Sequence, residues 1–307
     1  MINLNGLKLK NRYLVAAGAL EYGRGWPWER FLIKLGIINP GLFGAIITKT
    51  ITLEPRKGNF IDPLDWENAT FNWTFKCDMS NSNVLKMSRK VLKRVPSGWM
   101  NNMGWWNVGV DYYIQEIYPQ TKHLPIIVNI GGFGIEEYLK LIEKLNPLDI
   151  LGIEINISCP NVGTNDELRR DMAYFSTEAK RTSKHPLILK IGASEEDVFL
   201  SQTASACGFN AISGINAVPG LLVTKEGIFL GGQSGKRIKE TGLYTVFKLK
   251  EALKITKTPI IGGGGVSSWK DYCDYRAVGA DAVTFGSVYF TQPWKHTLIT
   301  KLHPENK

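Results

Sequence analysis

The sequence predicts a (β/α)8 barrel, a fold in which eight parallel strands alternate with helices. Short apolar runs rich in β-branched residues recur along the chain, separated by amphipathic stretches with helical spacing. The runs are apolar throughout, which is typical of a parallel sheet covered on both faces. Eight such runs within 307 residues fit one barrel, so we expect residues 1–307 to form a single domain. Its active site is expected at the carboxyl ends of the strands.

The elements follow one another in the alternating order that a barrel requires. We expect strands at residues 13–17, 45–50, 125–130, 152–158, 187–191, 211–215, 259–262 and 282–285. Helices are expected at residues 135–145, 166–181, 195–207, 243–255 and 269–278. Ser194 and Ser268 each precede a predicted helix and are suitable N-caps, because a serine hydroxyl accepts a hydrogen bond from the first helical turn.

The interval 51–124, between the second and third predicted strands, is far longer than a single crossover needs. It holds five of the nine tryptophans, namely Trp66, Trp73, Trp99, Trp105 and Trp106. Because the interval begins at the catalytic end of the predicted barrel, we expect an elaborated loop over the site. An insertion that packs its own tryptophans is the alternative.

The composition is that of an ordinary globular enzyme, with 44% hydrophobic and 21% charged residues. The four cysteines, Cys77, Cys159, Cys207 and Cys273, lie far apart with no C-x-x-C pair, so we expect neither a metal site nor a disulfide framework. No apolar run reaches the roughly 18 residues of a membrane span, and the start lacks the features of a secretory signal. We therefore expect a cytoplasmic protein without membrane contact.

The chain is basic, with 37 Lys+Arg against 28 Asp+Glu and a formal net charge of +9. Such a surplus suits a nucleic acid, an anionic substrate, or neither, since net charge bears on partners and not on fold. The densest basic stretch has the spacing of a helix face and comprises Lys86, Arg89, Lys90, Lys93 and Arg94. A solvated helix face is the simpler interpretation, and an anion or partner patch is the alternative.

Polar residues fall where the predicted strands end. Lys49 ends the second strand, Asn129 the third and Lys190 the fifth; Asn156, with Cys159 and Asn161, marks the end of the fourth, and Asn216 follows the sixth. In a barrel these positions converge on one volume. Asparagine offers a donor and an acceptor without charge, and lysine offers a cation. The set therefore suits a planar, anionic heterocycle with amide or imide edges.

Two glycine-rich turns follow the last two predicted strands, at residues 262–265 and at Gly286–Ser287. Backbone N–H groups exposed at these turns form the usual phosphate site of barrel enzymes. A glycine run alone is most often a tight turn, but its place in the strand count predicts a phosphorylated ligand or cofactor.

Cys159 is the candidate catalytic residue from chemistry alone. Pro160 ends its strand and the flanking side chains are polar, so the thiol is expected to face the cavity, where it could act as a general base or acid. A small buried hydrophobe is the ordinary alternative for a lone cysteine. None of the four histidines belongs to this set, which disfavours a histidine-based triad.

Taken together, these segments resemble the dihydroorotate dehydrogenase family, class 1. The segments that carry the resemblance are 48–59 (TKTITLEPRKGN), 101–104 (NNMG) with Asn107, 156–161 (NISCPN), Lys190, Asn216, 231–235 (GGQSG) and 262–265 (GGGG). The resemblance covers about Ala16 to Phe290. It implies an FMN-bearing barrel that oxidises dihydroorotate to orotate in pyrimidine biosynthesis.

The resemblance also implies roles for individual residues. Cys159 would take the proton from carbon 5 of dihydroorotate, Lys49 would lie between flavin and substrate, and Lys190 beside the flavin pyrimidine ring. Substrate would be held by Asn101, Met103, Gly104, Asn156, Asn161 and Asn216. FMN would be held by Ala17, Gly18, Lys49, Asn129, Asn156, Ser158, Lys190, Gly214, Gly235, Gly264, Gly265, Gly286 and Ser287.

Cysteine at the base position is typical of class 1, and the Leu-Glu-Pro-Arg and Gly-Gly-x-Ser-Gly segments resemble its 1B branch, whose catalytic subunit works with an iron–sulfur/FAD subunit and NAD. Because this chain has no cysteine cluster, that electron route would need a second polypeptide. Because members of the family are usually homodimers, the resemblance also implies a homodimer. The resemblance leaves the physiological electron acceptor open.

Three features depart from the family pattern and keep other functions open. Ala217 stands where Ser or Thr is usual, Trp105 stands where Leu is usual, and the segment 58–98 is longer than expected. They favour, as an alternative, an FMN-dependent oxidoreductase of another pyrimidine or cyclic imide. A dihydrouridine-synthase-like RNA-modifying flavoenzyme would suit the positive charge, but only about 20 residues follow Ser287, too few for an RNA-binding domain. A non-catalytic FMN-binding protein is disfavoured by the intact set of Lys49, Cys159 and Lys190.

Overall fold

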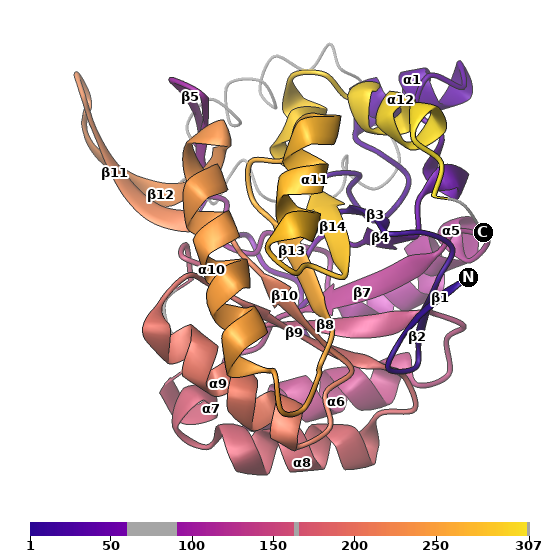
Figure 1. Ribbon diagram of the computed structural model, residues 1–307, viewed down its shortest axis with the longest axis vertical. Coiled ribbons are helices and arrows are strands. Elements are labelled where there is room, and N and C mark those ends of the chain that lie inside the picture. The colour runs from indigo at the N-terminus through magenta and orange to yellow at the C-terminus, as the bar shows by residue number, and fades with distance from the viewer. Residues whose placement is uncertain (60–90, 163–165, 306–307) are drawn as a thin grey trace.

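Eight parallel strands close into a barrel at the centre of the molecule (Figure 1). The computed structural model describes residues 1–59, 91–162 and 166–305. The barrel strands are β3 (Tyr13–Val15), β4 (Ala45–Ile47), β7 (Ile126–Ile130), β8 (Gly152–Asn156), β9 (Leu187–Ile191), β10 (Ala211–Gly214), β13 (Ile260–Gly263) and β14 (Ala282–Phe285). Each pairs with its neighbours in chain order, and β14 pairs with β3 to close the ring. The predicted (β/α)8 barrel and all eight predicted strands are confirmed.

Helices surround the barrel (Figure 1). They are α1 (Pro27–Lys34), α4 (Val110–Tyr112), α5 (Tyr118–Thr121), α6 (Ile135–Leu145), α7 (Asp166–Arg170), α8 (Met172–Thr182), α9 (Glu195–Ala206), α10 (Lys239–Ala252), α11 (Trp269–Ala277) and α12 (Lys295–Leu302), with a π-helical turn η2 (Tyr113–Ile117) and 3-10 turns η1 (Pro40–Leu42), η3 (Lys236–Ile238) and η4 (Ser287–Phe290). Both predicted serine caps are confirmed: Ser194 accepts from the Asp197 N–H, and Ser268 from the Asp271 N–H. The helix expected over 166–181 is divided at Asp171 into α7 and α8.

The barrel interior is apolar near the amino ends of the strands. Alternate residues of each strand point inward. At the amino ends these include Leu14, Ile127 and Ile188, which pack into one cluster with Leu7 and Leu9 of a small hairpin. That hairpin, β1 (Ile2–Leu4) and β2 (Leu7–Leu9), pairs antiparallel and lies against this end of the barrel. This part of the buried core therefore fills the amino-terminal end of the barrel.

The interior is polar near the carboxyl ends of the strands, because the same alternation brings polar residues inward there. On β7 the inward positions run from Ile127 to Asn129, and on β9 from Ile188 to Lys190. On β8, Glu154 and Asn156 share this face. The change from apolar to polar within one strand places the site at the carboxyl end, as the sequence predicts.

A second sheet lies beyond that end of the barrel. It contains β5 (Leu92–Val95), β6 (Gly98–Asn101), β11 (Val218–Thr224) and β12 (Gly227–Gly235) in the order β11-β12-β6-β5, all antiparallel. Figure 1 shows β11 and β12 projecting from the body of the molecule. The sheet joins the interval 51–124 to the connection that follows β10.

The basic stretch was expected on one helix face, and this expectation is wrong for Lys93 and Arg94, which lie in strand β5. A short turn at Pro96 and Ser97 folds β5 back onto β6, so the segment pairs as a hairpin. Lys86, Arg89, Lys90, Trp66, Trp73 and Cys77 lie outside the described residues. Among the helices described here, none is long and apolar enough to cross a membrane.

Candidate functional site

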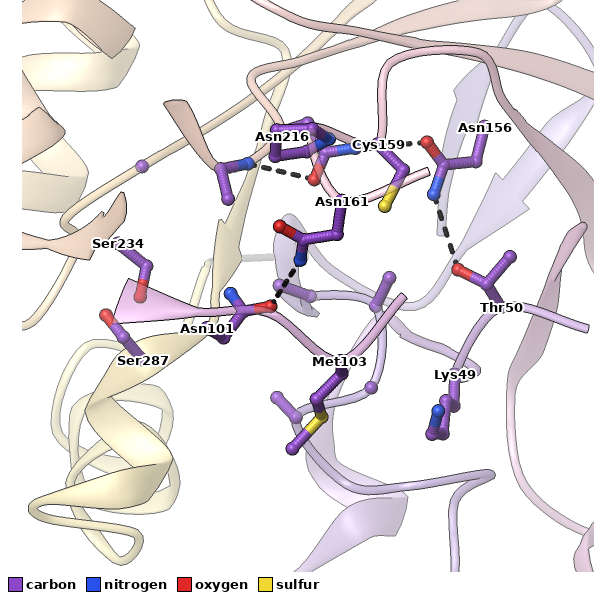
Figure 2. A pocket seen from close by; sticks show the side chains of 18 of the residues that line it. Lys49, Thr50, Asn101, Met103, Asn156, Cys159, Asn161, Asn216, Ser234 and Ser287 are labelled. Carbon is purple, nitrogen blue, oxygen red and sulfur yellow. Dashed lines mark hydrogen bonds between the residues drawn. The ribbon is translucent and has the colours of Figure 1, made fainter. Parts of the chain in front are cut away.

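A cavity opens where the barrel rim meets the second sheet (Figure 2). Its lining combines strand-end side chains of the barrel with residues of the sheet above. From the predicted set it contains Ala17, Gly18, Lys49, Asn101, Met103, Gly104, Asn156, Cys159, Asn161, Lys190, Asn216, Gly235, Gly264, Gly265, Gly286 and Ser287. Segments that are far apart in sequence therefore converge on one volume, as the barrel model predicts.

The lining carries positive charge. Lys49 and Lys190 are its ionisable cations, and among the described residues no Asp or Glu lines the cavity. Both lysine side chains are about nine-tenths buried. The carboxylate paired with Lys190, that of Glu154, lies behind the wall, so on the cavity side the two ammonium groups favour a ligand that carries negative charge.

Four asparagines form two hydrogen-bonded pairs around the cavity (Figure 2). Asn216 Nδ2 donates to Asn156 Oδ1 at 3.0 Å, and Asn156 Nδ2 donates to Thr50 Oγ1 at 3.3 Å. Asn161 Nδ2 donates to Asn101 Oδ1 at 2.9 Å. Such amides offer a bound ligand both donors and acceptors without net charge.

Cys159 lies between these pairs, and Figure 2 shows its sulfur pointing into the cavity. Burial raises the pKa of the thiol above its usual value. The backbone N–H of Asn161 and the ammonium groups of Lys190 and Lys49 act in the opposite direction and lower the pKa. The thiolate is therefore disfavoured by desolvation and supported by both cations, which suits a base that takes up a proton during turnover.

Lys49 is held tightly at the cavity wall. Its Nζ donates to the backbone oxygen of Trp106 and lies 4.8 Å from the centre of that indole ring. Burial lowers the pKa of Lys49 to about 8, while Glu21 and Cys159 act to raise it. Glu21 is itself paired with Arg24 and Arg30, each at 3.2 Å. The Lys49 cation thus loses its proton near pH 8.

The turns after β13 and β14 present backbone donors. Within the described chain, the N–H groups of Gly264, Gly265, Gly286 and Ser287 donate to no other residue. Gly265 has φ +73°, and a Cβ there would lie 2.9 Å from Gly235 O. A side chain at position 265 would therefore press against the backbone around Gly235 and Lys236 and displace the turn that carries these N–H groups. The arrangement suits a phosphate group.

Three predicted cofactor residues do not line the cavity. Asn129 points into the barrel, but it lies one layer of side chains closer to the amino ends of the strands. There its Nδ2 donates to Glu154 Oε1 at 2.6 Å. Gly214 has the opposite orientation: a Cβ there would meet Leu249 and Thr245 of α10, outside the barrel. Ser158 also lies behind the lining, with its hydroxyl donating to Lys190 O at 3.1 Å.

Sequence reasoning missed several residues of the site. Glu154 is fully buried and lies 3.5 Å from Lys190 Nζ. The strand alternation that identified Asn156 could have found it, since the two share one face of β8. Trp26, Phe290 and Ser234 also line the cavity. Their positions depend on non-local packing, for which the sequence holds no local signal.

Comparison with known proteins agrees with this geometry. A model of the family described as dihydroorotate dehydrogenase matches residues 89–304. Similar proteins include the dihydroorotate dehydrogenase B (NAD(+)) catalytic subunit of Bacteroides thetaiotaomicron, 30% identical over 95% of this chain and 88% of that protein. The proteins of the same name from Phocaeicola vulgatus and Thermoanaerobacter sp. are each 31% identical, with the same two coverages.

Proposed function

The chain belongs to the dihydroorotate dehydrogenase family, and we propose that it oxidises (S)-dihydroorotate to orotate with FMN, in pyrimidine biosynthesis. The observation that carries the proposal is the cavity itself. Cys159 points into a space lined by four asparagines and two buried lysines, with no carboxylate among the described lining residues. That lining fits an anionic, amide-bearing substrate next to an anionic cofactor.

FMN fits the residues that the chain provides. The unpaired N–H groups after β13 and β14 suit its single phosphate, and the tight turn that presents them packs so closely against Gly235 that it requires glycine at position 265. Ala17, Gly18 and Lys190 would line the flavin ring. When bound, FMN supplies the acceptor for the hydride that leaves carbon 6 of the substrate.

The protein's own groups would do the remaining work. Cys159, as thiolate, takes the proton from carbon 5 of dihydroorotate, so that the loss of this proton and of the hydride leaves the carbon–carbon double bond of orotate. Lys49 and Lys190 hold positive charge where negative charge develops, which lowers the barrier in a buried site. Because both lysines also favour the thiolate of Cys159, the same cations serve both purposes.

Substrate binding is assigned to the asparagines and to the turn after β6. Asn101, Asn156, Asn161 and Asn216 would bond the ring amides. The backbone N–H groups of Met103 and Gly104 would take the carboxylate. Gly104 has φ +65°, and a Cβ at that position would collide with the Asn59 side chain. The turn is therefore closely packed against segment 51–59.

A second candidate is an FMN-dependent oxidoreductase of another pyrimidine or cyclic imide. It is favoured by Trp105 and Ala217, which both line the cavity and alter its shape relative to the family pattern. Rapid-mixing measurements of flavin reduction by dihydroorotate and by dihydrouracil distinguish the two. The main proposal expects dihydroorotate to be faster by at least about tenfold, since a carboxylate bound by charge-assisted hydrogen bonds contributes that much. Faster reduction by dihydrouracil would favour the second candidate.

The similar proteins are named catalytic subunits, which implies a separate electron-transfer partner. We propose that this chain passes its electrons to an iron–sulfur/FAD subunit and so to NAD, as a homodimer in the cytoplasm. Co-expression with such a subunit should confer NAD reduction by dihydroorotate. The chain alone should lack that activity while its flavin is still reduced by the substrate.

A further inference from the structure

Three polar residues form a chain that begins at the cavity floor and continues beneath it. Asn129, Glu154 and Lys190 lie on the adjacent strands β7, β8 and β9, and all three point into the barrel. Asn129 is directly opposite Glu154 in the strand register, and its Nδ2 donates to Glu154 Oε1 at 2.6 Å. Lys190 Nζ lies 3.5 Å from the same oxygen. One carboxylate oxygen thus contacts both neighbours.

Burying this charged pair in the barrel interior costs desolvation free energy. Glu154 has no exposed surface, and its second oxygen, Oε2, has no hydrogen-bond partner among the described residues. A buried ion pair is a poor source of stability, because apolar residues of similar size usually do as well or better. The layer directly below is apolar. The pair therefore calls for a functional explanation.

The position of the Glu154–Lys190 pair relative to the cavity provides a functional explanation. Lys190 lines the cavity, whereas Glu154 lies behind it and does not. Glu154 is the carboxylate paired with Lys190 in the described chain. Any effect of Glu154 on a bound ligand therefore passes through the placement and the net charge of Lys190.

We propose that Glu154 is a positioning residue that holds the Lys190 ammonium at the cavity floor and offsets its charge, thereby setting the reduction potential of bound flavin. The inference rests on the proposed FMN site. Uptake of two electrons and one proton converts the neutral oxidised flavin ring to an anion, which a nearby cation stabilises and a nearby carboxylate opposes. The paired carboxylate thus keeps Lys190 from making the flavin too strong an oxidant.

The test compares flavin potentials in the FMN-loaded protein. Glu154→Gln keeps the shape of the side chain and an oxygen for the Asn129 hydrogen bond but removes the negative charge. In a dye-coupled titration at the potential where the wild type is half reduced, the ratio of reduced to oxidised flavin in E154Q should rise roughly tenfold, the scale of one nearby charge. Glu305→Gln is the matched control. It removes a carboxylate paired with Arg12 at 3.4 Å, at the opposite end of the barrel, and should leave the ratio unchanged.

Two more variants test whether Glu154 acts through Lys190. Lys190→Met should lower the ratio, and the double variant E154Q/K190M, which is neutral like the native pair, should return it toward the wild-type value. A purely structural role would not produce this compensation. If the E154Q single variant does not fold, the double variant should still unfold at a higher temperature than Lys190→Met, because it leaves no unpaired buried charge.

The outcomes that overturn the inference are separate from failure of the proposed function. FMN-loaded E154Q with the wild-type ratio, or a double variant that keeps the ratio of E154Q, overturns the inference alone. A double variant no more stable than Lys190→Met overturns the pairing on which it depends. A wild-type protein that binds no FMN contradicts the proposed function and the inference together.

Discussion

Asn161 Nδ2 donates to Asn101 Oδ1 at 2.9 Å, and this hydrogen bond joins the barrel rim to the sheet above it. Asn161 follows β8, whereas Asn101 ends β6, and the backbone oxygen of Asn161 also accepts from Asn59 Nδ2 at 3.1 Å. Three segments of the chain therefore meet at one residue, Asn161. The cavity walls are held in place by the same groups that are proposed to bind substrate.

The role of Cys159 as the base gives the first prediction. Cys159→Ala should bind FMN and orotate but reduce its flavin with dihydroorotate at least ~10²-fold more slowly, the usual scale for loss of a general base. Cys159→Ser should be intermediate and should gain rate as the pH rises. Cys207→Ala, which changes a thiol on the outside of the barrel near Ala173, is the control and should retain the wild-type rate. Near-normal reduction in the Cys159→Ala variant would show that the thiol is structural.

The second prediction concerns pH. Because burial raises the pKa of Cys159, the thiolate is scarce at neutral pH, and the rate of flavin reduction should rise as the solution becomes alkaline. Burial lowers the pKa of Lys49 to about 8, so above that pH its cation is lost and binding of the anionic substrate should weaken. Rapid-mixing experiments at several pH values separate the two effects as rate and apparent Kd.

Lys49→Met supplies the control for the pH prediction. It should bind dihydroorotate more weakly at neutral pH, and it should not lose further affinity near pH 8, since it has no proton to release there. A flat rate profile in the wild type would contradict the thiol as base. An unchanged alkaline loss of affinity in Lys49→Met would assign that loss to another group.

The glycine turn gives a third prediction with a closely matched control. Gly265→Ala places a Cβ 2.9 Å from Gly235 O at φ +73°, which should displace the turn and lower FMN occupancy. Gly36→Ala has nearly the same strain, at φ +70°, but no atom lies within 4 Å of its Cβ. Flavin content per protein, read from the visible spectrum, should fall in the Gly265 variant and stay at the wild-type level in the Gly36 variant. Equal flavin in both would contradict the phosphate assignment.

The fourth prediction decides between the two candidate substrates. Ala217 lines the cavity, so Ala217→Ser adds a hydroxyl beside Asn216. If orotate is the ligand, one added neutral hydrogen bond, worth about 0.5–1.5 kcal/mol, should tighten its binding roughly 2–10-fold. If the cavity is shaped for another substrate, the hydroxyl lacks a partner and binding of that substrate weakens. Titration calorimetry of orotate into both proteins gives the sign, and undetectable orotate binding in both would contradict the dihydroorotate assignment.

The barrel was predictable because its strands are local features. Each is a short apolar run, and the polar residue at its end marks the direction of the site, as Lys49 and Asn156 show. The second sheet was not predictable in this way. Strand β6 pairs with β12, so that Asn101 lies opposite Gly232, more than a hundred residues away. No periodicity within either segment specifies that partner.

The helix expected at the basic stretch fails for a specific physical reason. Lys93 and Arg94 were assigned to a helix by charge spacing alone, although Pro96 and Ser97 mark a turn that favours a hairpin. Gly214 is a different case, because the family resemblance implies its cofactor role; a Cβ at that position would face α10, and the role stays a prediction. Charge spacing must therefore be read together with the turn residues that follow it.

The central claim is that this cavity holds FMN and passes electrons to it from dihydroorotate. Anaerobic titration of the purified protein with dihydroorotate, followed by its visible spectrum, tests this claim most directly. We expect a yellow protein whose flavin absorbance is lost as dihydroorotate is added, with one orotate formed for each FMN reduced. A colourless protein that cannot be reconstituted with FMN, or a yellow protein whose spectrum excess dihydroorotate leaves unchanged, would contradict the account.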